Sequence, residues 1–221
     1  MRPVFINSLL CLALFSAGCG SIQYERARFD GNRIANPTLG RGVYYQIPDT
    51  YAVLNPWSPV PTKPENVAFE TYLRRITALN DESKQQVAFR ETLLFRAENR
   101  YLWIFHASMN LPGTFRGMHP GNRKLIMPAI AAESYRYFGV PQADFDYGYE
   151  QLGGRSLIIY KPFRLDARKT GEGWRGVGAT VIGDVTDIMD VKIFAREADL
   201  PAAEADLKAV LAGFSYGKPL P

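Results

Sequence analysis

Two long segments of alternating character, residues 87–95 and 101–107, constrain the fold of this chain more than any other feature. Side chains of one kind recur at every second residue in both segments, which is the period of a β-strand. Glu98, Asn99 and Arg100 lie between the segments and suit a tight turn. The pattern therefore predicts two long neighbouring strands that run antiparallel.

The remaining elements follow from the same combination of period and turn residues. The helical spacing of Phe69, Tyr72, Leu73 and Ile76 predicts a helix that begins at Pro64. Strands joined by short turns favour antiparallel pairing, so we expect an α+β fold, a largely antiparallel β-sheet with helices packed on it. The other predicted elements are a hairpin of residues 43–47 and 51–54, helices over 126–138 and 201–212, and strands over 144–149, 156–163, 176–182 and 188–195.

The N-terminus has the features of an export signal. An apolar run extends from Val4 to Phe15, after Arg2 and before a cluster of small residues. A positive start, an apolar middle and small residues before a cleavage point are typical of a secretory signal peptide. The run is too short for a standard membrane span, which needs about 20 apolar residues. We therefore expect the rest of the chain to be exported.

The residues Ser16-Ala17-Gly18-Cys19-Gly20, which follow this run, resemble the lipobox of bacterial lipoproteins. The resemblance implies a signal peptide of residues 1–18 and a lipidated Cys19 that carries two or three acyl chains such as palmitate. Residues 19–41 are then the lipidated cysteine and its tether, and residues 42–221 form a single globular domain. The glycine after the cysteine implies the outer membrane, with the domain facing the periplasm. Cleavage by an ordinary signal peptidase, with secretion and no anchor, is the alternative.

Cysteine content and charge argue against several classes of function. Cys11 would leave with the signal and Cys19 would be acylated, so we expect no thiol nucleophile, redox pair or thiolate metal site. The formal net charge is +4, a mild excess compared with the strongly basic surface of a nucleic-acid-binding protein. We therefore expect no nucleic-acid partner, no metal and no cofactor.

Two short motifs are Ile47-Pro48-Asp49-Thr50-Tyr51 in the first predicted hairpin and the segment from Leu207 to Ser215 at the last predicted helix. Together with the order of the predicted elements, they resemble the PsbP/Mog1-like α/β/α sandwich. The resemblance covers residues 42–216 by pattern, with residues 111–139 as an insertion. It implies a layered fold and, because that family consists mostly of binding and assembly factors, a role without catalysis.

Positive charge gathers among glycines in the predicted loop of residues 111–124. Arg116, His119, Arg123 and Lys124 lie there, and the glycines would expose backbone N–H groups. Cationic side chains and free N–H groups are the ingredients of an anion-binding loop. Solvated loop charge is the competing interpretation, and it is the more common one.

The other histidine, His106, alternates with Leu102 and Ile104 on a predicted strand. A general base or a ligand is one interpretation, and a core histidine with a single hydrogen bond is the one that the pattern favours. Residues 171–176 match the spacing GxGxxG. Because the residues that follow favour a strand and not a helix, we interpret this motif as a hairpin loop and not as a dinucleotide site.

Two groups of carboxylates complete the candidate chemistry. The first has a spacing of three residues, which is not the spacing of a calcium-binding EF-hand loop. The second lies among aromatic residues, as in a sugar-binding or glycosidase cleft, but also as on the polar face of an ordinary strand. The first group is Asp184, Asp187 and Asp190, and the second is Asp144, Asp146 and Glu150.

Two functions fit these observations. The first is a non-enzymatic lipoprotein of the bacterial cell envelope that binds an envelope protein, a lipid or a cell-wall fragment. The second is an anchored hydrolase that acts on a cell-envelope polymer, which would need His106 or His119 beside a carboxylate such as Asp144 or Asp146. We expect binding rather than catalysis, because the sequence contains no pattern that pairs a nucleophile with a base.

Overall fold

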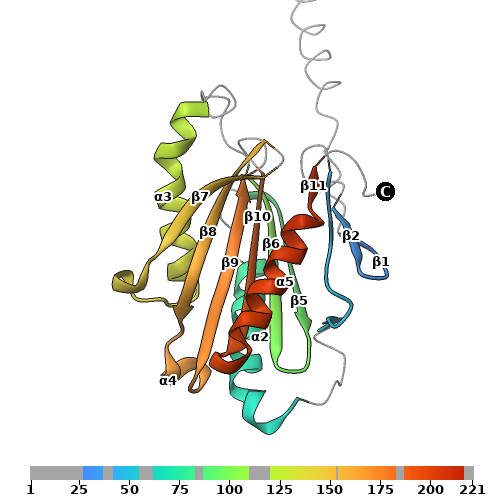
Figure 1. Ribbon diagram of the computed structural model, residues 1–221, viewed down its shortest axis with the longest axis vertical. Helices are drawn as coiled ribbons and strands as arrows, with labels where there is room; N and C mark the ends of the chain where they lie inside the picture. Colours follow the sequence, from blue (N-terminus) through green and yellow to red (C-terminus); the bar gives the residue numbers. More distant parts are fainter. Residues whose placement is uncertain are drawn as a thin grey trace, which may run out of the picture.

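A computed structural model describes residues 27–36, 42–54, 62–82, 87–109, 120–152, 154–182 and 187–216. Its centre is a seven-stranded sheet in which every neighbouring pair is antiparallel. Figure 1 shows this sheet with helices against it, so the predicted α+β class is confirmed. In spatial order the strands are β4 (Ala52–Val53), β5 (Val87–Arg96), β6 (Arg100–Met109), β10 (Asp187–Arg196), β9 (Trp174–Ile182), β8 (Arg155–Arg164) and β7 (Tyr147–Leu152).

The predicted central hairpin is confirmed as β5 and β6. Phe95 pairs with Leu102 and Glu91 with His106 across the two strands. The prediction succeeds because an alternating pattern fixes which side chains face each side of a sheet. The later strands β8, β9 and β10 are also confirmed, within two residues at their ends. The strand expected over residues 144–149 begins later, at Tyr147, because Gln142–Asp144 form the short helix η2.

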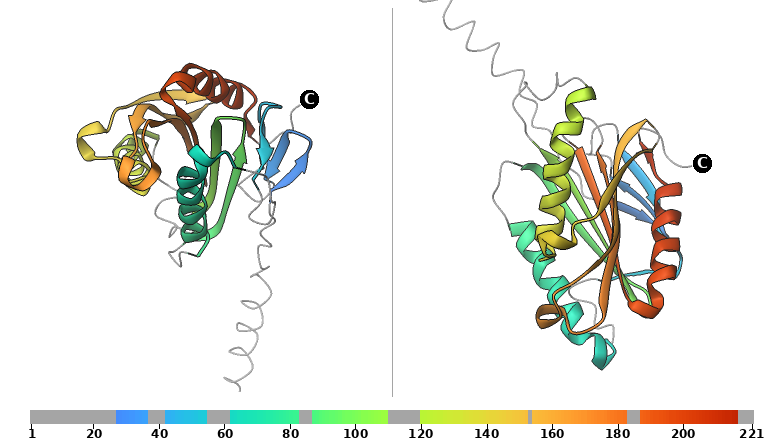
Figure 2. Two further views of the ribbon diagram at one scale, coloured as in Figure 1. Left: turned by 90° about the horizontal axis from the view of Figure 1, so that it is seen from below. Right: turned by 60° about the vertical axis from the view of Figure 1, so that its left-hand side comes forward.

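Helices cover both faces of the large sheet, as Figure 2 shows from below. Helix α5 (Leu200–Ala212) packs on one face together with a second, smaller sheet. Helices α2 (Val67–Glu82) and α3 (Pro120–Tyr137) cover the other face. Each face has its own apolar core, so the central strands of the large sheet are buried on both sides, whereas the edge strands β4 and β7 are largely exposed. Strands buried on both sides carry few polar residues, and those that occur inside must be paired.

The hairpin predicted for residues 43–54 does not form. Strand β3 (Val43–Gln46) belongs to the smaller sheet, whereas β4 pairs with β5 in the large one. The turn residues Pro48, Asp49 and Thr50 therefore carry the chain from one sheet to the other. The turn itself is real, since the Tyr51 N–H donates to the Pro48 carbonyl at 3.0 Å. Turn chemistry does not decide which partner each flanking strand finds.

Part of the predicted tether is folded. Strands β1 (Arg28–Asp30) and β2 (Arg33–Asn36) form a hairpin, and β2 continues the smaller sheet by pairing with β3. The two-residue turn Gly31-Asn32 joins them, with a positive φ of 58° at Gly31. Such a turn is a recognised hairpin signal that the polar composition of the segment concealed. The short strand β11 (Ser215–Tyr216) completes this sheet.

The predicted helices are confirmed with shifted ends. Pro64 begins the short helix η1 (Pro64–Asn66), which runs directly into α2. Helix α3 begins at Pro120 and not near residue 126, which is consistent with the preference of proline for the first helical turn. Besides η2, two short helices were not predicted, α4 (Ala167–Thr170) and η3 (Glu197–Asp199). Within the described ranges, no helix combines the length and the apolar character needed to cross a membrane.

Gly178 on β9 marks a close approach inside the sheet. A Cβ atom at this position would overlap the backbone oxygen of Val191 and the side chain of Lys192. We expect Gly178→Ala to lower the free energy of unfolding by about 1–3 kcal/mol or more, the usual cost of overpacking. Gly148→Ala on β7 is the matched control, because a Cβ there meets nothing within 4 Å. Urea unfolding with equal losses in both variants would contradict this role of Gly178.

Candidate functional site

The predicted anion-binding loop does not appear as one site. Arg116 and His119 lie outside the described residues, as do Cys19 and Asp184. Arg123 and Lys124 lie in the first turns of α3 and not in a loop. The prediction placed the helix start too late because it did not assign Pro120 to the first turn. The anion-binding role of these four residues therefore stays a prediction.

His106 is fully buried on the face of the large sheet that the smaller sheet covers. Its Nε2 atom lies 3.1 Å from the Tyr45 hydroxyl on β3. Its Nδ1 atom lies 3.5 Å from a carboxylate oxygen of Glu91, the residue opposite it on β5. The same carboxylate accepts the backbone N–H of Ala27 at 3.0 Å. The preference for a core histidine agrees with this burial, although His106 has more than one polar neighbour.

The carboxylate beside the histidine is not one that the sequence suggested. Asp146 forms a surface ion pair with Lys161 at 3.1 Å, and Asp144 and Glu150 are exposed. Glu91 was not considered as a site residue because it lies in a segment whose other alternating residues are apolar. Its position opposite His106 is a signal that correct pairing of the two strands would have revealed. The Tyr45–His106–Glu91 group thus connects the two sheets with each other and with the backbone of Ala27.

A second polar group lies under α3, on the opposite face of the sheet. Lys192 is fully buried, and its ammonium group contacts the carboxylate of Asp190. The Thr180 hydroxyl donates to Asp190 at 2.7 Å and the Ser134 hydroxyl donates to it at 2.9 Å. The Lys192 ammonium also lies 3.8 Å from the centre of the Tyr160 ring. Four elements, α3, β8, β9 and β10, thus meet at one ion pair.

Burial determines the protonation behaviour of this lysine. Loss of solvent lowers the pKa of Lys192 to about 8, while contact with Asp190 acts in the opposite direction. The absence of a side chain at Gly178 leaves the space that the aliphatic part of Lys192 occupies. In the sequence, Asp190 stands out only as one of three carboxylates, with Asp184 and Asp187, whose spacing does not match a calcium-binding loop. The signal for the pair was an acidic and a basic residue two positions apart in a strand that is apolar on both faces.

The lowered pKa of Lys192 predicts a specific dependence of stability on pH. Between its folded pKa of about 8 and its unfolded value of about 10.4, the folded chain has released a proton that the unfolded chain retains. Stability due to this group therefore rises with pH in that window. Relative to Lys192→Met, the wild type should gain on the order of 1–3 kcal/mol between pH 7 and pH 10. A constant difference between the two unfolding free energies would contradict the lowered pKa.

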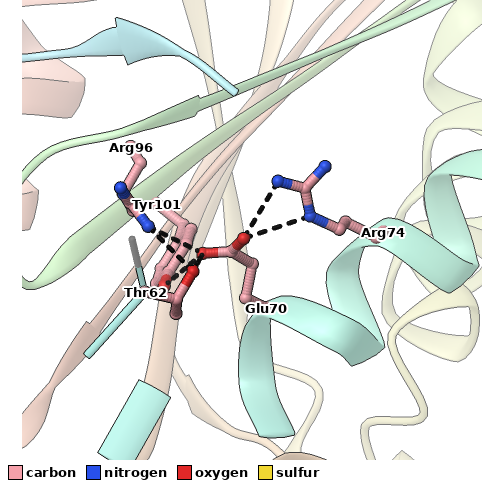
Figure 3. Close-up of polar contacts among 5 residues, drawn as sticks. All are labelled: Thr62, Glu70, Arg74, Arg96 and Tyr101. Atoms are coloured by element: carbon pink, nitrogen blue, oxygen red, sulfur yellow. Dashed lines mark hydrogen bonds and ion pairs between the residues drawn. The ribbon is translucent and has the colours of Figure 1, made fainter. Parts of the chain in front are cut away.

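The third polar group surrounds Glu70 on α2, and Figure 3 shows its contacts. One carboxylate oxygen accepts from the Arg74 guanidinium at 3.0 and 3.1 Å. The other accepts from Thr62 at 2.9 Å, and from Arg96 and Tyr101 at 3.1 Å each. Glu70 and Arg74 lie off the apolar stripe of Phe69, Tyr72, Leu73 and Ile76, yet the Glu70 side chain is only 7% exposed.

Charge and hydrogen bonds keep Glu70 ionised despite its burial. Desolvation acts to raise the pKa of Glu70, but hydrogen bonds from Thr62, Arg74 and Tyr101 outweigh it and leave the pKa below its ordinary value. Burial and the neighbouring carboxylate raise the pKa of the Tyr101 hydroxyl, which therefore stays protonated as a donor. The group holds the Arg96 guanidinium in one place by two hydrogen bonds from its Nη1 atom, to Glu70 and to Thr62.

A pocket of about 290 Å³ opens beside this group, and we call it the Arg96 pocket. It lies between β4, η1 and the turn that joins β5 to β6. Most of its apolar wall comes from the β4 segment, and its charged groups come from the start of η1 and from the β5–β6 turn. The lining residues are Thr50, Ala52, Val53, Leu54, Lys63, Asn66, Arg96, Ala97, Glu98 and Tyr101.

The remaining sequence motifs have structural roles. Gly171 and Gly173 have φ values of 78° and 77°, and Trp174 begins β9 directly after them, so the GxGxxG stretch is a loop between antiparallel strands as predicted. In the described parts of the chain, no three His, Cys, Asp or Glu side chains are grouped so that they could hold a metal ion. The Arg96 pocket places a fixed guanidinium beside apolar side chains, so we take it as the candidate functional site.

Comparison with known proteins gives a weak structural similarity. No protein-family model matches the chain, and no curated protein matches it. The solution structure of cyanobacterial PsbP (CyanoP) from Synechocystis sp. PCC 6803 has a TM-score of 0.41 and 11% sequence identity, over 90% of this chain and 96% of that chain. The similarity is too weak to bear on function, and the finer PsbP/Mog1 resemblance stays a prediction.

Proposed function

We propose that this protein is a lipid-anchored module of the bacterial cell envelope that binds a small ligand in the Arg96 pocket. The observation that carries the binding role is the pocket itself, in which a guanidinium held by Glu70 lies beside an apolar wall. Small-molecule sites combine a mostly apolar cavity with a few fixed polar groups. The anchoring role rests on the lipobox resemblance at Cys19, with the domain facing the periplasm from the outer membrane.

The anchor is tested at the N-terminus of the native protein. Mass spectrometry of the protein purified from membranes should find Cys19 as the first residue with attached acyl chains. Cys19→Ala should abolish that modification and remove the correctly processed protein from the membrane fraction. A first residue without acyl chains would overturn the anchor and would favour ordinary secretion.

The pocket is tested with an uncharged probe that fits a small cavity. Isovaleramide is added to the full chain in lipid nanodiscs, and the backbone amide signals of Val53, Asn66 and Ala97 are followed by NMR. We expect saturable shifts at these residues and no saturable shift at Gly148, which lies on the opposite edge strand. Empty nanodiscs correct for partition of the probe into lipid. If neither isovaleramide nor a charged analogue moves these signals, the binding role is wrong.

A hydrolase that acts on an envelope polymer is the alternative function. The 3.5 Å contact between His106 and Glu91 is the observation in its favour. General base catalysis also requires that substrate reach the histidine, which is 0% exposed. The test is whether the native protein hydrolyses peptidoglycan and whether the folded His106→Gln variant does not. If both were observed, this alternative would replace the binding role.

A further inference from the structure

The charges around the Arg96 pocket point to the chemical class of its ligand. We propose that the pocket binds a small carboxylate with a short aliphatic chain, an inference that rests on the proposed function and specifies it. Four observations carry it: the net charge of the site, the fixed position of Arg96, the apolar wall and a buried amide. Each of them concerns side chains that the structure describes.

The site carries one excess positive charge. Lys63 and Arg96 line the pocket with Glu98, and Glu70 and Arg74 lie directly behind it. Lys63 pairs with Glu98 at 2.9 Å, and Glu70 pairs with both arginines. Among the residues that line the pocket, the two cations Lys63 and Arg96 stand against the one carboxylate Glu98, which leaves a charge of +1. A monoanion would neutralise the site, whereas a cation would add to its charge.

Arg96 is prepared to bind an anion without rearrangement. Its Nη1 atom donates to Glu70 and Thr62, and among the described residues these are its hydrogen-bond partners. The other N–H groups of the planar guanidinium remain available, since arginine has five donors. Its side chain is 13% exposed, so a ligand would meet a largely desolvated charge. A fixed donor loses little side-chain entropy when it binds, and the affinity is correspondingly greater.

The rest of the lining selects an aliphatic body. Ala52, Val53, Leu54 and Ala97 present apolar atoms, and Val53 is 50% exposed in the free protein. Burial of such surface by an aliphatic ligand is favourable, because it removes apolar atoms from water. The volume of about 290 Å³ lies at the lower limit of typical ligand pockets, so it fits a small molecule. Inorganic phosphate would leave this apolar wall in contact with water.

Asn66 provides a second polar contact for the same ligand. The residue is 4% exposed and lines the pocket. A side-chain amide donates through two N–H groups, which a carboxylate ligand would accept. The carboxylate of the ligand would accept from both Asn66 and Arg96 if it lay between them.

The test compares probes of similar shape and different charge. Isovalerate, isovaleramide, isoamylamine and inorganic phosphate are each added to the full chain in nanodiscs, and the amide signals of Val53, Asn66 and Ala97 are followed. We expect isovalerate to bind about tenfold or more tightly than isovaleramide, the factor that a charge-assisted hydrogen bond adds. Isoamylamine should bind more weakly than isovaleramide. Inorganic phosphate should bind more weakly than isovalerate.

The probes distinguish an error in the proposed ligand class from an error in the proposed binding role. If isovaleramide binds and isovalerate binds no more tightly, the carboxylate class is wrong while the pocket remains a binding site. Tighter binding of isoamylamine or phosphate than of isovalerate also overturns that class. If no probe moves the signals of the pocket, both the class and the proposed function are wrong.

Two variants test the groups that recognise the anion. Lys63→Gln removes an exposed cation of the pocket and should weaken isovalerate about two- to fivefold. Lys161→Gln is its matched control, because it removes an exposed lysine on β8 that pairs with Asp146. Arg96→Lys keeps the charge but loses the planar donors, so it should weaken isovalerate about tenfold. If Arg96→Lys does not fold, the Lys63→Gln and Lys161→Gln pair still decides, since equal affinities would contradict the inference.

Discussion

Asp190→Ala is expected to lower the free energy of unfolding by about 3–5 kcal/mol, because it leaves the buried ammonium of Lys192 without its counter-ion. The Ser134 and Thr180 hydroxyls lose their acceptor in the same change. Urea unfolding at pH 7, followed by circular dichroism, measures the loss. Asp146→Ala is the control, because that carboxylate forms only an exposed pair and should cost less than about 1 kcal/mol.

The double variant Asp190→Ala/Lys192→Met shows why the single change is costly. Replacement of a buried ion pair by apolar groups is often neutral or stabilising, whereas removal of one partner is not. We therefore expect the second substitution to recover most of the stability that the first one loses. The contradicting result is additivity, in which the double variant loses the sum of the free energies that Asp190→Ala and Lys192→Met lose separately. The two side chains would then be independent, and the pair would not exist.

Glu70→Ala is expected to have an effect of similar size, about 3–5 kcal/mol. The carboxylate is the acceptor for Thr62, Arg74, Arg96 and Tyr101, so its removal leaves several donors without a partner. Thermal or urea unfolding measures the loss. Glu98→Ala removes an exposed carboxylate near the same pocket and should cost about 0.2–1 kcal/mol.

The same change should also affect the Arg96 pocket. Glu70 holds the Arg96 guanidinium through Nη1, so folded Glu70→Ala protein should bind isovalerate more weakly even under conditions in which it is fully native. Glu70→Gln keeps the shape of the side chain and should bind more tightly than Glu70→Ala, although more weakly than the wild type. Equal affinity in all three proteins would show that Glu70 has no positioning role.

Local sequence pattern predicted the large sheet well. The hairpin of β5 and β6 and the strands β8 to β10 have a clear period and clear turns, and the structure confirms them. Pairing between distant segments was not predictable. The sequence of residues 43–54 is typical of a hairpin, yet its two halves join different sheets. Such a choice depends on the whole core and not on the turn.

Polar residues inside the core were harder to interpret. Glu70 and Arg74 have the spacing of an exposed helical ion pair, and nothing in the sequence of α2 shows that residues 62, 96 and 101 converge on Glu70. Asp190 and Lys192 were more accessible to prediction, since opposite charges two residues apart share one face of a strand. The Arg96 pocket was missed because its lining comes from three segments that only the fold brings together.

A crystal structure of the full chain grown with isovalerate tests the ligand site most directly. The carboxylate should lie within hydrogen-bond distance of the Arg96 guanidinium and the Asn66 amide, with the branched carbon chain against Val53 and Ala97. An empty Arg96 pocket at saturating isovalerate, or a ligand bound there with its carboxylate turned away from Arg96, would contradict the proposed recognition.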